Sequence, residues 1–228
     1  FAVMSALSGC GSEAKTVSDS GFYAIVYKDH CEINGVSAES EQVNVPQKIK
    51  GKPVTAIAEG TFSGLPVVSV TLPDTVTSIG KAAFANCNNL VEIKLPGSLN
   101  ALPDSVFFRC ISLTSANLPD SLVSIGENAF YECNKLTIDR LPGSLVTIGP
   151  YAFAGCTSIT GVSLPDTVSE IGDSAFEGAS SLGAFSSGKG LVRIGKNAFG
   201  LCTALKSVTL NDGLSEIGTD AFAETAIE

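Results

Sequence analysis

A hydrolase with a serine or cysteine nucleophile needs a base beside that nucleophile, and the only histidine of this chain is His30. Cys31 follows it directly, so these two residues are the first candidates for catalytic chemistry. Adjacent residues in a strand point to opposite faces, which separates an imidazole from a neighbouring thiol. We therefore interpret the pair as chance neighbours and predict that the chain is not an enzyme.

The cysteines are the second candidates, because the chain has seven of them and five recur in one column of a repeat. The five are Cys87, Cys110, Cys133, Cys156 and Cys202. A zinc site would need converging thiolates at about 2.3 Å, whereas these come from separate repeats with no histidine nearby. Disulfides between neighbouring units are also disfavoured, since side chains in register point the same way and their thiols are poorly aligned for bonding. Ala179 replaces cysteine in one unit, which favours a small buried apolar position and no metal site.

Aspartates also fall in one column, which would suggest a calcium site if the column were continuous. The column holds Asp74, Asp120, Asp166 and Asp212, and it is interrupted by Gly97 and Gly143. Aspartate is favoured at turns in any case, so we interpret the column as turn residues. No glycine-rich phosphate loop follows a predicted strand, and no cofactor is predicted.

The amino-acid composition excludes several classes of protein and of binding partner. Of 228 residues, 44% are hydrophobic and 16% are charged, which argues against a disordered chain and against a coiled coil. Lysine and arginine total 14 against 23 acidic residues, a net charge of −9. Because nucleic-acid binding depends on basic patches, nucleic acid is not an expected partner.

The dominant feature of the sequence is a 23-residue repeat that runs through most of the chain. One phenylalanine stands at the same place in each unit: Phe84, Phe107, Phe130, Phe153, Phe176, Phe199 and Phe222. An isoleucine or leucine column keeps the same spacing, as at Ile125, Ile148 and Ile171. Several columns in phase over six units predict a solenoid, in which each unit buries its apolar side only against its neighbours.

Each unit reads as two extended pieces with a bent connection. Residues 90–95 alternate apolar with polar, as in a half-buried strand, and Pro96 ends that strand. A second short extended piece follows around 99–102, and the Ala-Phe step after it predicts a single helical or 3₁₀ turn. Glycines follow the second piece, where we expect a turn with positive φ: Gly80, Gly126, Gly149, Gly172, Gly195 and Gly218.

One unit departs from the pattern at the strand itself. Asp139 occupies the column that holds Ile93 and Val162 in other units, and Ile138 lies beside it. An unpaired buried carboxylate would cost several kcal/mol. We therefore predict a local bulge that turns Ile138 inward.

The unit resembles the BspA-type leucine-rich repeat, whose sense is L-x-x-I-x-L-P-x-[ST]-[VL]-x-x-I-G-x-x-A-F-x-x-C. The resemblance covers roughly residues 43–228. It implies a leucine-rich-repeat solenoid, a right-handed superhelix that is mainly β, with short strands. Proteins of this type are associated with adhesion to host extracellular proteins, so the resemblance implies a surface protein that binds partners.

The first residues, FAVMSALSGC, resemble the end of a bacterial lipoprotein signal, and the LSGC that closes them matches a lipobox. In this interpretation Cys10 carries the lipid that anchors the chain to a membrane. The alternative is an arbitrary apolar N-terminus that packs on the first repeat. We expect three regions: a signal remnant and tether at 1–21, an N-terminal cap at 22–45, and an array of about eight units at 46–228 whose last unit is incomplete.

The outward side of the longer strands is the candidate binding surface, a concave strand face. Its residues are Ser69, Thr71, Glu92, Lys94, Ser115, Asn117, Arg140, Ser163, Ser207 and Thr209. Few of them are the aromatic or arginine residues that dominate binding energy, which favours weak or multivalent contacts. The expected partners are host or neighbouring-cell proteins or glycans, bound by an exported, lipid-anchored monomer. A structural spacer of the cell envelope and an envelope enzyme subunit remain as alternatives.

Overall fold

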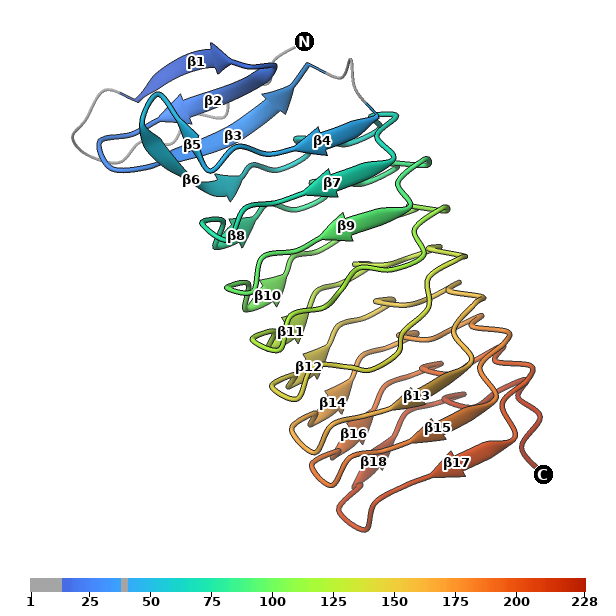
Figure 1. Cartoon of the computed structure of the whole chain (residues 1–228). Helices are drawn as coiled ribbons and strands as arrows, with labels where there is room; N and C mark the ends of the chain where they lie inside the picture. Colours follow the sequence, from blue (N-terminus) through green and yellow to red (C-terminus); the bar gives the residue numbers. More distant parts are fainter. Residues whose placement is uncertain (1–13, 38–40) are drawn as a thin grey trace.

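The computed structural model describes residues 14–37 and 41–228 and shows a mainly β solenoid of about 8 turns (Figure 1). The N-terminal strands form a sheet over one end of the stack, and the C-terminus lies at the opposite end (Figure 1). In the described ranges no residue is helical, so no helix there could cross a membrane. The repeat predicted from the columns is thus a continuous stack of turns.

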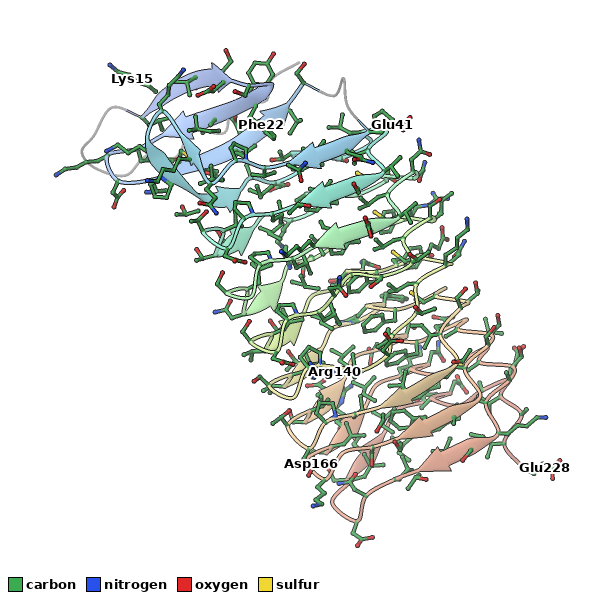
Figure 2. The ribbon with its side chains drawn as sticks, in the orientation of Figure 1. Lys15, Phe22, Glu41, Arg140, Asp166 and Glu228 are labelled. Atoms are coloured by element: carbon green, nitrogen blue, oxygen red, sulfur yellow. The ribbon has the colours of Figure 1, made fainter. Side chains whose placement is uncertain are left out.

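The sheet at the N-terminal end is continuous with the first turns of the array. Its antiparallel part consists of β1 (Lys15–Asp19), β2 (Phe22–Val26) and β3 (Cys31–Val36). Strand β3 pairs in parallel with β6 (Lys52–Ile57), which also pairs with β5 (Lys48–Ile49) and β8 (Ser78–Ile79). Figure 2 marks Phe22 in this sheet, where its side chain is buried. Strand β1 lies within the range 1–21 that was predicted as a tether, whereas Cys10 lies outside the described residues.

The repeats contribute two parallel ladders along opposite sides of the stack (Figure 1). The longer strands are β4 (Gln42–Asn44), β7 (Ser69–Thr71), β9 (Glu92–Lys94), β13 (Gly161–Ser163), β15 (Ala184–Ser186) and β17 (Ser207–Thr209). The shorter strands are β10 (Ala101–Leu102), β11 (Ser124–Ile125), β12 (Thr147–Ile148), β14 (Glu170–Ile171), β16 (Arg193–Ile194) and β18 (Glu216–Ile217). Pairing is in register, so equivalent residues of successive units lie side by side, as Ile148 lies beside Ile171.

The phenylalanine column forms a continuous stack inside the array. Successive rings from Phe62 to Phe222 are separated by centroid distances between 4.8 and 5.5 Å, with interplanar angles of 21° or less. Such spacing suits offset stacking, and each ring buries about 150–250 Å². The rings from Phe62 to Phe199 are fully buried, which makes this column the axis of the core.

The segments expected to form a helical or 3₁₀ turn form runs of hydrogen-bonded turns instead. Ala82 and Asn86 have φ angles of 51° and 59°, and the same two positions are left-handed in the following units. A helix excludes such residues. Because left-handed residues interrupt the helical conformation, backbone groups of the corner bond to the next turn. The Phe84 N–H donates to the Val106 carbonyl at 2.9 Å. The corner therefore joins the stack through backbone bonds between turns.

The glycine column was expected to provide positive φ, and the structure shows a different reason for it. Positive φ is absent at all six glycines, Gly80, Gly126, Gly149, Gly172, Gly195 and Gly218. A Cβ atom at these positions would lie 2.3 to 2.9 Å from backbone atoms of the preceding turn. Glycine is thus required for the close approach of two turns.

Substitution of this column tests that explanation. In Gly172→Ala the Cβ would lie 2.5 Å from the Pro150 nitrogen, so we expect unfolding at lower urea with a loss of about 1–3 kcal/mol. The matched control is Gly143→Ala, because a Cβ there meets nothing within 4 Å. We expect the control to change stability by no more than about 0.5 kcal/mol. Equal losses in the two variants would contradict a steric role.

Candidate binding face and its central pocket

The side chains of His30 and Cys31 have different surroundings, and His30 lies just before β3 begins at Cys31. The Cys31 side chain is buried, and its Sγ donates to the Pro53 carbonyl at 3.4 Å. The His30 ring stacks on Tyr27 with centroids 4.6 Å apart, and its Nδ1 lies 2.7 Å from an Asp29 carboxylate oxygen. Burial raises the pKa of the Cys31 thiol, which keeps it protonated. The buried, protonated thiol and the imidazole held by Tyr27 and Asp29 therefore do not have the geometry of a nucleophile and its base.

The cysteine column is buried, and its thiols bond the turns together. In each case Sγ donates to a phenylalanine carbonyl of the preceding turn, as Cys133 does to Phe107 at 3.1 Å and Cys110 does to Phe84 at 3.0 Å. All six cysteines among the described residues are free. Burial raises the pKa of Cys133 and of Cys202 to about 12. The column consists of buried thiols that bond to main-chain carbonyls, in agreement with the interpretation as small core residues.

The aspartate column contributes to turns and ion pairs. Asp120 pairs with Arg140 at 2.7 Å, and an Asp166 carboxylate oxygen accepts the Lys189 backbone N–H at 2.9 Å. Within residues 14–37 and 41–228, no group of three or more histidine, cysteine, aspartate or glutamate side chains converges as a metal site would require. The column thus offers turn contacts and no cation cage in this part of the chain.

The residues predicted for the binding surface lie on the outward side of the longer strands, which we call the strand face. Ser69, Thr71, Glu92 and Lys94 stand on β7 and β9, while Ser163, Ser207 and Thr209 stand on β13 and β17. Ser115, Asn117 and Arg140 lie between these two groups, where the ladder is interrupted. The strand face is thus one surface in two halves with a break at its centre.

Sequence reasoning missed Ser186 on this face. Its hydroxyl donates to the Ser163 hydroxyl at 3.0 Å, which joins β15 to β13 on the outward side. The column spacing alone would have placed it there, since it follows Ser163 by one repeat.

The break in the ladder coincides with two unusual inward positions. Strand β9 is followed only by an isolated bridge between Glu92 and Ser115, and residues 137–140 form no strand. Ala116 is small where other units have isoleucine, valine or phenylalanine. In the next unit Ile138 packs against the core while Asp139 is exposed, which confirms the predicted bulge.

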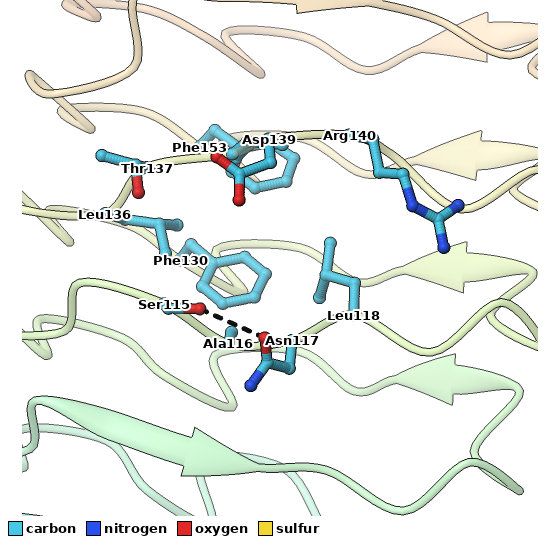
Figure 3. Close-up of a pocket in the computed structure, with 11 residues that line it drawn as sticks. Ser115, Ala116, Asn117, Leu118, Phe130, Leu136, Thr137, Asp139, Arg140 and Phe153 are labelled. Carbon is cyan, nitrogen blue, oxygen red and sulfur yellow. Dashed lines mark hydrogen bonds between the residues drawn. The ribbon is translucent and has the colours of Figure 1, made fainter.

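A pocket of about 280 Å³ occupies this break (Figure 3). Leu118, Leu136 and Ile138 contribute apolar walls, and the rings of Phe130 and Phe153 lie behind them. The polar lining consists of Ser115, Asn117, Thr137, Asp139 and Arg140. The Ser115 hydroxyl donates to the Asn117 side-chain oxygen at 3.5 Å. Sequence columns predicted the bulge, whereas the pocket arises from the meeting of two adjacent units.

A second pocket of about 240 Å³ lies on the opposite ladder, and its charges are paired with one another. Arg193 contacts Glu170 and Glu216, the latter at 3.2 Å, and lies 3.6 Å from Asp173. These pairs raise the pKa of the Arg193 guanidinium. The second pocket is therefore a row of ion pairs between turns.

Comparison with known proteins identifies the repeat. The sequence profile described as "BspA type Leucine rich repeat region" matches residues 55–182 and 138–228, in 6 copies. The chain belongs to the BspA-type leucine-rich repeat family. No curated protein matches the chain. The resemblance inferred from the repeat is thereby confirmed.

Solved structures of bacterial leucine-rich repeat proteins share the architecture. A leucine-rich repeat protein of T. pallidum is 26% identical, with a TM-score of 0.65 over 92% of this chain and 89% of that chain. One from Bacteroides ovatus is 22% identical, with a TM-score of 0.52 over 95% and 80% of the two chains. The pneumococcal vaccine antigen PcpA is 18% identical, with a TM-score of 0.54 over 91% and 78%. The last two likenesses concern the fold alone.

The cysteine column predicts resistance to alkylation in the folded protein. With the pKa of Cys133 and Cys202 at about 12, only about one thiol in ten thousand is ionised at pH 8. We expect iodoacetamide to label Cys133 and Cys202 at pH 8 only after the protein is unfolded in urea, as measured by peptide mass spectrometry. Labelling of these two cysteines in the native protein at the rate of the unfolded chain would contradict this burial.

Proposed function

We propose that this protein is exposed at a cell surface and binds a protein or glycan of a host or neighbouring cell through the strand face. The observation that carries the proposal is the strand face itself, a row of exposed polar side chains on in-register strands with a pocket at its centre. A solenoid presents such a row over an extended surface. Fixed spacing between equivalent side chains allows a repetitive partner to be contacted at several points.

The chemistry of the strand face favours many small contacts over one dominant contact. Its outward positions are mainly serine and threonine, with Glu92, Lys94 and Arg140 as charged exceptions. Arg140 is already paired with Asp120. High affinity at an interface usually depends on a few buried aromatic or arginine anchors. Binding through this face therefore depends on several simultaneous contacts or on an anchor supplied by the partner.

Family membership and fold likeness support the surface location by analogy. Leucine-rich repeat proteins of this type share a binding scaffold, and one protein of similar fold is a pneumococcal vaccine antigen. Analogy of fold is a weak guide to function. The proposal for this chain accordingly rests on the strand face and its test.

The strand face can be tested with matched charge insertions. Ser163→Arg with Ser207→Arg places two bulky cations on exposed positions of β13 and β17, and we expect binding to a panel of purified extracellular proteins and glycans to fall at least about tenfold. The control, Ser78→Arg with Thr147→Arg, adds the same charge on exposed positions of β8 and β12. Surface plasmon resonance would measure both variants.

Two outcomes would count against a binding role for the strand face. Equal losses in the two variants would show that charge, not location, alters binding. The absence of any partner above background at micromolar concentration would favour a structural spacer of the envelope. Circular dichroism of each variant would establish that the fold is retained.

The membrane anchor is a separate proposal that rests on the LSGC sequence ending at Cys10. We expect the protein from membranes of its native cells to begin at a lipid-modified Cys10, because two or more acyl chains are needed for stable anchoring. Intact-mass spectrometry of membrane fractions would measure the modification. An unmodified Cys10 with residues 1–9 retained would exclude it.

A further inference from the structure

The central pocket contains one charge that the protein itself leaves unpaired. Asp139 has no hydrogen bond or ion pair with any residue that the structure describes, and its carboxylate lies in the break near the Phe153 ring, across the Phe130 ring from Asn117 in this view (Figure 3). Arg140, the other charged residue of the lining, is paired outside the pocket with Asp120. The pocket is therefore open to a cation.

We propose that this pocket binds a lysine or arginine side chain presented by a partner protein. The inference rests on the proposed function and specifies the anchor that the strand face itself lacks. The cationic end pairs with Asp139, and the hydroxyl of Ser115 and the amide oxygen of Asn117 offer further acceptors at the rim. A net charge of −9 attracts a basic partner over longer range.

The walls of the pocket suit the aliphatic part of a basic side chain. Leu118 and Ile138 are partly buried and pack against the core, so each leaves some apolar surface facing the pocket. Lysine and arginine bury their methylene stems on such surface while the charged end stays near water. The pocket volume of about 280 Å³ lies just below the roughly 300–1,000 Å³ usual for whole small ligands, which fits a single side chain.

A sugar is a poorer occupant than a basic side chain. Sugar rings gain much of their binding energy by packing on exposed aromatic faces, yet Phe130 and Phe153 are both 0% exposed. The remaining lining residues include no tryptophan or tyrosine. The pocket thus provides a carboxylate and aliphatic walls, and no aromatic platform.

The interrupted ladder also leaves main-chain groups for the partner. In regular units the residue after the strand bonds to the next unit, as the Leu72 N–H does to the Lys94 carbonyl at 3.1 Å and the Leu164 N–H does to the Ser186 carbonyl at 2.9 Å. The equivalent bond from Leu118 to Arg140 is not formed in the described structure. A partner segment that inserts its side chain here can also bond to this backbone.

The origin of the pocket suggests two variants that close it, one of them without a change in composition. Exchange of Ile138 and Asp139, written I138D/D139I, returns an apolar residue to the inward column and a carboxylate to the outward one. Ala116→Ile separately fills the pocket with the residue that Ile93 supplies in a regular unit. We expect both to abolish the pocket and to raise the melting temperature.

The proposal can be tested with small probes on the full chain. Nα-acetyl-lysine amide and Nα-acetyl-arginine amide would be titrated, with Nα-acetyl-norleucine amide as a neutral control and methyl glucoside as a sugar. We expect millimolar binding of the two basic probes, detected as amide shifts at Asn117, Ile138 and Asp139 by NMR. Asp139→Asn should weaken this binding about tenfold, and I138D/D139I and Ala116→Ile should abolish it.

The matched control is Asp212→Asn, which removes one exposed carboxylate far along the array and should leave binding unchanged. Equal binding to Asp139→Asn and the original chain would overturn the proposal, as would a preference for norleucine amide or glucoside. Shifts spread over all acidic residues would also overturn it. These probes report on the pocket alone. A failure of the probe titration therefore leaves the charge-insertion test of the strand face unaffected, and a failure of the charge-insertion test leaves the probe titration valid.

Discussion

The short and constant separation of adjacent turns governs the whole structure. Parallel backbone hydrogen bonds hold each turn against the next, so equivalent residues meet directly along columns. Each residue in a column must therefore pack against the equivalent residue of the adjacent turn. Phenylalanine satisfies this by stacking at 4.8 to 5.5 Å, and glycine satisfies it where two backbones come closest. One spacing thus selects a different residue type at each position of the repeat.

Polar atoms inside such a stack must bond across turns, and small side chains achieve this. The hydroxyls of Ser121 and Thr167 donate to carbonyls of the preceding unit, the latter to Leu145 at 2.6 Å. The thiols do the same from the core side, as Cys156 does to Phe130 at 3.1 Å. A buried carbonyl without a donor costs about 1–3 kcal/mol, so each of these bonds stabilises the interface between the two turns that it joins.

The same regularity explains why the central pocket arises where the ladder is interrupted. A perfect ladder presents a flat, polar surface with little to distinguish one ligand from another. Ala116 and Asp139 interrupt the inward column in two successive units, and the backbone bonds between them are lost along with the packing. Natural proteins accept such local losses of stability mainly where they serve binding. The pocket combines a hollow, apolar walls and an unpaired carboxylate on the strand face.

The sequence was enough to predict the repeat, the buried columns, the bulge at Ile138 and the outward residues of the strands. The reason is that the alternation of apolar and polar residues indicates which positions are buried. The reason for the glycine column could not, since a close approach between Gly172 and Pro150 involves residues of two different turns. The corner was also misjudged, because left-handed residues such as Asn86 and Arg109 leave no clear signal in sequence. The pocket likewise depends on how two units with different defects meet. Sequence determines what each turn buries, whereas the contacts between turns are decided only by the tertiary structure, because they depend on distances that no single repeat contains.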